Sequence, residues 1–206
     1  MKIGFIGCGN MGGALAKRFS NAGHSVMVSA RDKAHAEQCA AACGKAACAG
    51  SPSEAAGYAN VLVLAVPYSE KESAIKNAGN LDGKIVIDVT NPLKPDFSLA
   101  IGFSNSAAEE VAKLAPKAKV VKVFNTVFYQ VVENTEFPEK PTVFIVSDHE
   151  DAKAAAIKLA SEIGFEPVDA GPLSNARLLE PLAMLNIYLG YQAKMGTDIA
   201  FRLMKR

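Results

Sequence analysis

Three glycines close to the start of the chain have the spacing of a phosphate-binding loop. The segment that holds them matches the pattern G-x-G-x-x-G and consists of Gly7, Cys8, Gly9, Asn10, Met11 and Gly12. Gly7 permits a tight turn, Gly9 lets a pyrophosphate approach the backbone, and Gly12 lets a helix lie close to a strand. The N–H groups at the start of the following helix favour bound anions. Because the pattern follows a predicted strand and opens a predicted helix, it indicates a dinucleotide site.

The end of the second predicted strand distinguishes the two nicotinamide cofactors. NAD sites usually have an acidic residue here for the ribose 2′-hydroxyl, whereas this chain has Ser29, Ala30 and Arg31. A guanidinium offers several donors to a 2′-phosphate, Ser29 adds a hydroxyl donor, and Lys33 adds a second cation. Asp32 counts against this preference, but it lies where it can cap the next helix. We therefore expect NADP(H), with a solvated surface charge as the alternative for Arg31.

Three later strand ends should surround the nicotinamide half of the cofactor. They supply Val66 and Pro67, Asn91 and Pro92, and Asn125 and Thr126. Asparagine and threonine side chains hydrogen-bond to a ribose or a carboxamide, and they also cap loops. Their position at strand ends favours ligand binding, because ligands of parallel sheets lie at the carboxyl ends of the strands.

The other titratable side chains show no catalytic arrangement. The histidines, His24, His35 and His149, lie near predicted helix or strand starts and are expected at the surface. Asp88 lies near the end of a strand, where a structural role and a position near the ligand both stay open. The sequence shows no Ser/His/Asp or Cys/His arrangement, so we do not expect nucleophilic catalysis of that kind.

The four cysteines are Cys8, Cys39, Cys43 and Cys48. Their spacing does not match paired metal-binding motifs, and we expect small buried or half-buried thiols rather than a metal site. The alternative of a metal site rests on Cys39 and Cys43, which lie four residues apart on a predicted helix. Reduced thiols fit a cytoplasmic protein.

Composition narrows the class of protein. The chain has 206 residues, a formal net charge of +1 and an apolar fraction of 50%. This length suits one domain, or one domain with a small appendage, and the apolar fraction allows a substantial core. The net charge gives no support for a nucleic-acid partner or a membrane surface. The first residues run straight into an apolar strand, and no stretch approaches the roughly 18 apolar residues of a membrane helix. Neither a secretory signal nor a membrane span is therefore predicted.

Short apolar runs alternate with alanine-rich helical stretches along most of the chain. Strands are predicted at residues 2–6, 25–29, 45–47, 61–66, 84–89, 119–124, 142–146 and 165–169. Helices are predicted at residues 12–22, 33–42, 53–58 with Ser53 as cap, 106–114, 150–163 and 175–206. This alternation predicts an α/β fold of the Rossmann type, doubly wound, with a mainly parallel sheet.

The predicted strands stop near Gly171 and Pro172. We place a boundary there, between an NADP-binding Rossmann domain over residues 1–170 and a helical segment over residues 171–206. Within that segment, leucines recur at helical spacing at Leu178, Leu182, Leu185 and Leu189. This stripe must pack on the Rossmann domain or on a second copy of the chain, and we expect a homodimer, with the segment beside the nicotinamide pocket. For Arg177, contact with an anionic ligand and a helix-surface or capping role both stay open.

Two resemblances to known families accompany these motifs. The opening IGFIGCGNMGGALA resembles pyrroline-5-carboxylate reductases. The stretch DAGPLSNARLLE, from Asp169 to Glu180, resembles NADP oxidoreductases that use the deazaflavin coenzyme F420. The run VKVFNTV at residues 121–127 is similar to those enzymes and to the cytosolic domain of six-transmembrane metalloreductases. The second resemblance spans nearly the whole chain and carries the more specific motif.

The resemblance to deazaflavin-dependent enzymes implies an NADP site made of the glycine loop and a Ser-Arg pair after the second strand. The matching positions here are Ala30 and Arg31, so Ala30 departs from the family serine, and Ser29 stands beside it. After the strand at 119–124, archaeal members of the family have His-Thr-Ile-Pro, whereas this chain has Asn-Thr-Val-Phe at 125–128. That loop approaches the second ligand, so the departure bears on coenzyme F420 itself.

Three functions stay open at this point. The first is an NADP(H)-dependent oxidoreductase that passes a hydride between NADP(H) and a small-molecule redox partner, namely a deazaflavin, a flavin or a similar molecule. The second is a reductase of a small imine or carbonyl, which a proton donor near Asn125 or Asn91 would favour. The third is a non-catalytic NADP sensor. The short segment after Gly171 favours the first, because it cannot build the large helical domain that pyrroline-5-carboxylate reductases add.

Overall fold

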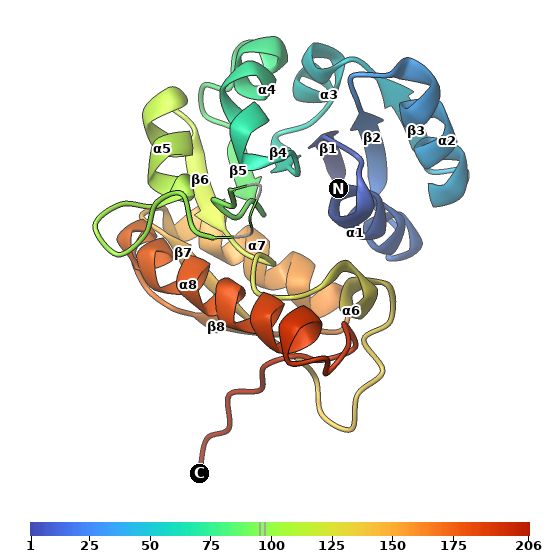
Figure 1. The fold of residues 1–206 in the computed structure, drawn as a ribbon. Helices are drawn as coiled ribbons and strands as arrows, with labels where there is room; N and C mark the ends of the chain where they lie inside the picture. Colours follow the sequence, from blue (N-terminus) through green and yellow to red (C-terminus); the bar gives the residue numbers. More distant parts are fainter. Residues whose placement is uncertain (95, 97) are drawn as a thin grey trace.

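The computed structural model describes residues 1–94, 96 and 98–206, and its centre is an eight-stranded sheet (Figure 1). The strand order is β3-β2-β1-β4-β5-β6-β7-β8. The strands are β1 (Lys2–Ile6), β2 (Ser25–Ser29), β3 (Ala47–Gly50), β4 (Val61–Leu64), β5 (Ile85–Asp88), β6 (Lys119–Lys122), β7 (Thr142–Ser147) and β8 (Glu166–Asp169). All neighbouring strands are parallel except β6 and β7, which are antiparallel. The predicted Rossmann-type, mainly parallel sheet is therefore confirmed.

Helices cover both faces of the sheet. They are α1 (Asn10–Asn21), α2 (Lys33–Cys43), α3 (Pro52–Tyr58), α4 (Lys71–Ala78), α5 (Ala107–Leu114), α6 (Tyr129–Glu133), α7 (Glu150–Glu162) and α8 (Ala176–Ile187), with shorter turns η1 (Tyr68–Glu70), η2 (Leu173–Asn175) and η3 (Tyr188–Gln192). One apolar core packs under α1, α2, α6 and α7, where Phe124 contacts the rings of Phe19 and Phe165 at centroid distances of 6.3 and 5.7 Å. The other packs under α3, α4, α5 and α8. Within the described part of the chain, no helix is both long enough and apolar enough to cross a bilayer.

Two predicted elements near the start of the chain have the wrong bounds. The strand predicted at 45–47 is β3, which begins later. The cap of α3 is Ser51 rather than Ser53, because Ser51 and Glu54 form a reciprocal capping box and Pro52 fits the first helical position. A capping serine therefore lies before the proline, not after it.

The strand predicted to run to Phe124 ends at Lys122 instead. Phe124 has a φ of +64°, which lies in the left-handed region and cannot continue a strand. The sequence also predicts no helix at α4 or α6. The buried face of α4 consists of just Ala74, Ile75 and Ala78 among charged residues, and α6 is too short to show a periodic pattern.

The helix predicted at 175–206 ends well before the chain does. α8 passes into η3, which is π-helical, and the described residues after Gln192 form no helix or strand. The N–H of Gly196, which has a φ of +81°, closes η3 with a hydrogen bond of 3.1 Å to the Gly190 carbonyl. The last residues then run beside the start of β7, where the Thr142 N–H donates to the Phe201 carbonyl at 2.8 Å.

Candidate functional site

The glycines of the loop between β1 and α1 are required for different reasons. Gly7 has a φ of +96°, and a methyl group added there would lie 2.3 Å from the Ala65 carbonyl oxygen. One added at Gly12 would lie 2.3 Å from the Gly7 carbonyl oxygen. A methyl group at Gly9 would meet no atom within 4 Å in the described structure. Gly7 and Gly12 are therefore required by the fold, whereas the space at Gly9 is open to a phosphate.

The start of α1 suits an anion. Gly9 is its N-cap residue and makes no side-chain capping bond, and the first turn carries no acidic residue. The N–H groups of that turn are therefore available to a ligand. Asn10 and Met11 line the cleft described below, whereas the Cys8 side chain lines a separate hollow beside α2.

At the end of β2, the side chain of Arg31 projects from the surface. It is 86% exposed, and its Nη1 lies 3.5 Å from Glu70 Oε1. Ala30, Arg31 and Glu70 line a small hollow of about 90 Å³. Asp32 caps α2 as expected, because its Oδ1 accepts a hydrogen bond of 2.9 Å from the Ala34 N–H. The acidic residue next to Arg31 thus has a local structural role.

Ser29 does not offer the hydroxyl donor that the sequence suggests. Its side chain is fully buried, and Oγ–H donates to the Phe5 carbonyl at 2.7 Å. A hydroxyl has one proton, so this bond leaves none for a phosphate. Lys33 is 90% exposed and lies 3.7 Å from Glu37. The exposed donors at this end of the site are therefore Arg31 and Lys33.

A cleft follows the carboxyl ends of β1, β4, β5 and β6. Its larger part has a volume of about 440 Å³ and is lined by Gly9, Asn10, Met11, Val66, Pro67, Tyr68, Thr90, Asn91 and Asn125, among others. An adjoining part of about 260 Å³ is lined by Thr126, Phe128, Tyr129, Asn186, Ile187 and Tyr191, among others. Asn91 and Asn125 line both parts. The structure thus brings the residues of the three strand ends together, with one exception.

The exception is Pro92, which the sequence predicts beside the nicotinamide together with Asn91. Pro92 is buried and does not line either part of the cleft. Its carbonyl accepts a hydrogen bond of 2.7 Å from the Ala100 N–H. The proline therefore closes a turn behind Asn91 rather than facing a ligand.

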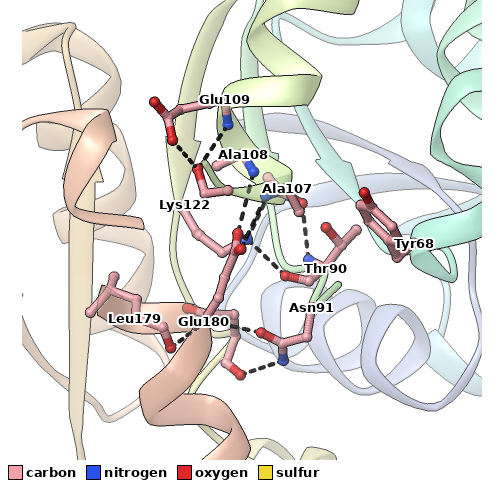
Figure 2. A network of polar contacts seen from close by, with 12 residues as sticks. Tyr68, Thr90, Asn91, Ala107, Ala108, Glu109, Lys122, Leu179 and Glu180 are labelled. Atoms are coloured by element: carbon pink, nitrogen blue, oxygen red, sulfur yellow. Dashed lines mark hydrogen bonds and ion pairs between the residues drawn. The ribbon is translucent and has the colours of Figure 1, made fainter. Parts of the chain in front are cut away.

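Asn91, which Figure 2 labels, and Asn125 hydrogen-bond to each other where the two parts of the cleft meet. Asn91 Nδ2 donates to the Asn125 carbonyl at 2.8 Å, and Asn125 Nδ2 donates to Asn91 Oδ1 at 3.1 Å and to the Leu179 carbonyl at 3.2 Å. Asn125 Oδ1 and Thr90 Oγ1 are buried and have no hydrogen-bond partner among the described residues. Because a buried polar atom without a partner costs free energy, both atoms suit a ligand that supplies hydrogen bonds.

A fully buried ion network lies next to Asn91, and Figure 2 labels two of its members, Lys122 and Glu180. Lys122 Nζ lies 2.8 Å from Asp88 Oδ2 and 3.0 Å from Glu180 Oε1, and it donates to the Thr90 carbonyl at 2.7 Å. All three charged side chains are 0% exposed. The Glu180 carboxylate also accepts from the first two N–H groups of α5, at 3.0 and 3.3 Å. This network fixes α8 and α5 to the strand ends that carry the asparagines.

The network shifts the pKa values of Lys122 and Glu180. Burial disfavours the ammonium of Lys122, but the carboxylates of Asp88 and Glu180 outweigh that effect and raise its pKa. Burial raises the pKa of Glu180, and the ammonium of Lys122 offsets part of this rise. Sequence reasoning missed Lys122 and Glu180 as partners of Asp88. The available signal was a lysine inside an apolar strand, because lysine is almost never fully buried unless it is paired.

Two further contacts join α5 to its neighbours. Arg177 binds Glu109 with both ends of its guanidinium, through Nε at 2.9 Å and Nη2 at 2.7 Å. This bidentate pair gives Arg177 a structural role between α8 and α5. The Tyr68 hydroxyl, in the wall of the cleft, donates to Glu110 Oε2 at 2.9 Å. Burial, together with this bond, raises the pKa of Tyr68 to about 12.

The histidines differ from one another. His35 and His149 are exposed, as expected, but His24 is buried, which corrects the expectation of a surface position. Its ring lies between the N-terminal amine, 2.9 Å from Nδ1, and Glu162 Oε2, 2.9 Å from Nε2. In the described part of the chain, no group of three or more His, Cys, Asp or Glu side chains is arranged to hold a metal ion.

Comparisons with known proteins match this geometry. The family model described as NADP oxidoreductase coenzyme F420-dependent matches residues 2–92. The F420-dependent NADP reductase of Methanocaldococcus jannaschii is 31% identical over 217 residues, and the match covers 97% of each chain. The metalloreductase STEAP3 of Rattus norvegicus is 31% identical over 186 residues, and the match covers 89% of this chain but 37% of that protein. A crystal structure assigned as an F420-dependent NADP-reductase from Arthrobacter sp. FB24 has a TM-score of 0.91 at 26% identity, with both chains fully covered at 100%.

The sheet, the glycine loop and the cleft define a Rossmann-type dinucleotide-binding oxidoreductase. Because its match to the M. jannaschii reductase extends over nearly the full length of both chains, this chain belongs to the family of NADP oxidoreductases that depend on coenzyme F420. It is an NADP-dependent oxidoreductase, and NADP(H) is its cofactor. The expected family, enzyme class and cofactor are confirmed.

Proposed function

We propose that this enzyme transfers a hydride between NADP(H) and a flat heterocyclic partner, namely a deazaflavin, a flavin or a similar molecule. The observation that carries the proposal is the two-part cleft, whose parts of about 440 and 260 Å³ meet at Asn91 and Asn125. Such a cleft allows two ring systems to lie in contact, and direct hydride transfer requires that proximity. The name of the M. jannaschii relative supports a deazaflavin as one such partner.

In this proposal NADP(H) follows the strand ends from β2 to β6. Its pyrophosphate occupies the open space at Gly9, beside the N–H groups of the first turn of α1. Its 2′-phosphate meets Arg31 and Lys33, whose side chains are 86% and 90% exposed. Its nicotinamide half lies along the residues of the larger part of the cleft, chiefly Val66, Pro67, Asn91, Asn125 and, at the junction with the smaller part, Thr126.

Two observations indicate that the residues of the cleft fit NADP(H). The space at Gly9 is free of protein atoms within 4 Å of a built Cβ, and Asn125 Oδ1 and Thr90 Oγ1 are buried acceptors without partners among the described residues. The cofactor supplies the hydride when it is bound. The protein orients the ring, and the amide of Asn125 is suited to accept from the carboxamide because its own N–H groups are held by Asn91 and Leu179.

The smaller part of the cleft suits the second ring system. Phe128, Tyr129 and Tyr191 give it an aromatic wall, and the rings of Phe128 and Tyr191 meet edge to face at a centroid distance of 5.7 Å. Aromatic walls of this kind stack well on flat heterocycles. Asn125 and Phe128 stand where archaeal relatives have histidine and proline, so the proposal includes flavins beside deazaflavins.

Reduction of an imine or carbonyl receives less support from the site. That reaction needs a proton donor near the nicotinamide, and Tyr68 is the hydroxyl best placed in the larger part of the cleft. Its proton is directed to Glu110, and its pKa is raised to about 12, which makes it a weak acid at neutral pH. The geometry therefore favours hydride transfer between two heterocycles, for which the protein donates no proton.

A steady-state screen tests the proposal. NADPH oxidation is measured with coenzyme F420, FMN, FAD, ferric chelates, quinones and small cyclic imines as acceptors. We expect turnover with a deazaflavin or flavin, and a Tyr191→Ala variant should lose kcat/KM for that acceptor while keeping its affinity for NADPH. Turnover on imines alone contradicts the proposal, and tight NADPH binding without turnover on any acceptor would favour the sensor function.

We also propose that the protein is a cytoplasmic homodimer. The described chain leaves Leu178 and Leu185 on the outer side of α8, 62% and 49% exposed, whereas Leu179 and Ala183 face the Rossmann core. The leucine stripe expected from sequence therefore has its two most exposed members available to a second copy of the chain. The four free thiols fit a reducing compartment.

A further inference from the structure

Three cysteine thiols gather beside the glycine loop. Cys8 belongs to the loop itself, whereas Cys39 and Cys43 lie one turn apart on α2. All three side chains line one hollow, in which Cys8 and Cys43 are buried and Cys39 is partly exposed. A methyl group at Gly13 would lie 3.6 Å from Cys39 Sγ and 3.5 Å from the Cys8 carbonyl oxygen. The Cys39 sulfur and the backbone of Cys8 therefore lie next to the same point at the start of α1.

This arrangement makes Cys39 the thiolate of the cluster. The hydrogen bonds from Cys43 and Cys8 lower the pKa of Cys39 to about 3, against the effect of burial. The same bonds raise the pKa values of Cys8 and Cys43. His35, one turn before Cys39, favours the thiolate as well, and its Nε2–H donates to the Cys8 carbonyl at 3.2 Å. The thiolate is the nucleophilic form of cysteine.

The cluster can be reached from solvent. A hollow of about 270 Å³ is lined by the three cysteines together with Lys17, His35 and Glu133. Because a water molecule takes up about 30 Å³ of liquid, a molecule the size of hydrogen peroxide can enter it. Gly9 and Asn10 line the same hollow, so it adjoins the phosphate-binding space.

We propose that Cys39 is a redox-active cysteine that reacts with hydroperoxides and then forms a disulfide with Cys8. The Cys39 thiolate attacks one peroxide oxygen, the O–O bond breaks, and the departing hydroxide takes up a proton to become water, which leaves a sulfenic acid on Cys39. The Cys8 sulfur then attacks the sulfenic sulfur, the S–O bond breaks, and water leaves with the Cys8 proton. Two thiols and one hydrogen peroxide thus give one disulfide and two water molecules.

Cys8 is better placed than Cys43 to form this disulfide. Side chains four residues apart on a helix have Cβ atoms about 5–6 Å apart, whereas a disulfide needs about 3.8 Å. A bond between Cys39 and Cys43 would therefore distort α2. Cys8 approaches Cys39 from a different element, the loop between β1 and α1, so a bond between them does not bridge one turn of a helix.

The disulfide would regulate cofactor binding, an effect that rests on the proposed position of the pyrophosphate. A covalent S–S bond is shorter than a hydrogen bond between two sulfur atoms, so it draws residue 8 toward α2. Residue 8 lies between Gly7 and Gly9, whose backbone shapes the phosphate space. The oxidised enzyme should accordingly bind NADPH less tightly than the reduced enzyme.

The test uses the full chain with Cys48→Ser, which removes the exposed thiol of β3. The protein is treated with hydrogen peroxide, its disulfides are mapped by peptide mass spectrometry, and its affinity for NADPH is measured before and after treatment. We expect a Cys8–Cys39 disulfide and an affinity lowered about tenfold or more, or 1.4 kcal/mol, restored by dithiothreitol. A further Cys43→Ser change should leave both results in place.

Two more variants separate the steps. With Cys39→Ser the disulfide and the loss of affinity should both disappear, and with Cys8→Ser a sulfenic acid on Cys39 should be trapped by dimedone. Oxidation that spares Cys39, or a Cys39–Cys43 product, overturns the assignment of the site. A Cys8–Cys39 disulfide with unchanged NADPH affinity overturns its regulatory role. If the reduced protein does not bind NADPH, the proposed cofactor site fails, while the disulfide map still decides the chemistry of the cysteines.

Discussion

The carboxylate of Glu180 lies 3.0 Å from the ammonium of Lys122, although one residue belongs to α8 and the other to β6 and neither side chain reaches solvent. A buried lysine needs compensating negative charge, and here the C-terminal helix supplies part of it. Residues 171–206 are therefore tied into the core of the Rossmann domain. Deleting residues 175–206 should give an aggregating protein rather than a folded monomer, because Lys122 and Asp88 lose their partner.

Replacing Lys122 by methionine should destabilise the protein strongly. Lys122→Met leaves Asp88 and Glu180 as buried carboxylates without a cation, which should cost about 3–5 kcal/mol of unfolding free energy. Lys119→Met, on the same strand, removes a partly exposed ion pair with Asp151, which solvent screens, and should cost far less. Chemical denaturation of both variants measures the difference. If both variants lose the same unfolding free energy, Lys122 does not neutralise the buried carboxylates of Asp88 and Glu180.

Arg31 should set the preference for NADPH. Arg31→Ala should weaken NADPH binding by roughly 1.5–3 kcal/mol, because a charge-assisted contact with the 2′-phosphate is lost. NADH has no such phosphate, so its affinity should hardly change. Fluorescence titrations with both cofactors provide the measurement. If the two cofactors weaken equally, Arg31 does not contact the 2′-phosphate.

Gly9→Val should abolish binding of NADPH and NADH while the fold persists. The structure has no protein atom within 4 Å of a Cβ built at Gly9, so the new side chain meets the incoming pyrophosphate rather than the protein. Gly57→Val is the matched control, because Gly57 on α3 has equally open surroundings and lies outside the cleft. Circular dichroism checks the fold and calorimetry checks binding. A folded Gly9→Val protein that still binds NADPH would refute the loop assignment.

The exposed leucines of α8 should hold the dimer together. Changing Leu178 and Leu185 together to glutamate should give a monomer with an intact fold. In the single chain Leu178 is 62% exposed and Leu185 is 49% exposed, so neither is needed for the core. Leu114→Glu, at the end of α5 and 39% exposed, serves as a control that should leave the dimer intact. Light scattering with size-exclusion chromatography reports the mass. A wild-type protein that is monomeric at high concentration would contradict the dimer.

Acid should weaken the contact between α5 and α8. The hydrogen bonds from Arg177 lower the pKa of Glu109 below its ordinary value, although partial burial opposes this. A carboxyl group with a lowered folded pKa stabilises the protein above its unfolded pKa and loses that contribution as the pH falls through the folded pKa. Glu109→Gln should therefore be less stable than wild type near neutral pH, by about 1 kcal/mol or less because Arg177 is partly exposed. The difference should shrink as the pH falls through the lowered folded pKa of Glu109, which lies below its unperturbed value near 4.3.

The sequence predicts the fold well because the central strands β1, β4, β5 and β6 are buried on both faces. Runs such as the one at β4 are continuously apolar, and each is followed by a turn residue at the edge where ligands lie. The glycine loop could be located for the same reason, since Gly7 and Gly12 are required by close backbone contacts. The sequence did not show how deeply individual polar side chains are buried. Ser29 and His24 could not be placed because their partners lie far away along the chain.

The ion network of Asp88, Lys122 and Glu180 also could not be predicted from local sequence patterns. Asp88, Lys122 and Glu180 are separated by long stretches of chain, and each belongs to a different element. Periodicity shows which face of a helix is apolar, but not that one buried position will hold a carboxylate. The same limit applies to Asn125, whose amide is oriented by the Leu179 carbonyl on α8.

The helix that follows the reversed strands β7 and β8 has a consequence for how this enzyme can diverge. The wall of the smaller part of the cleft includes Ala183, Asn186, Ile187 and Tyr191, whereas the glycines of the loop and Arg31 belong to the start of the chain. Asn186 is tied to the Thr126 carbonyl at 3.1 Å and Ala183 is buried, whereas Ile187 and Tyr191 are less buried. If the smaller part holds the second ring system, as proposed, substitutions of Ile187 and Tyr191 would change which acceptor fits without replacing Arg31 or the glycines of the loop.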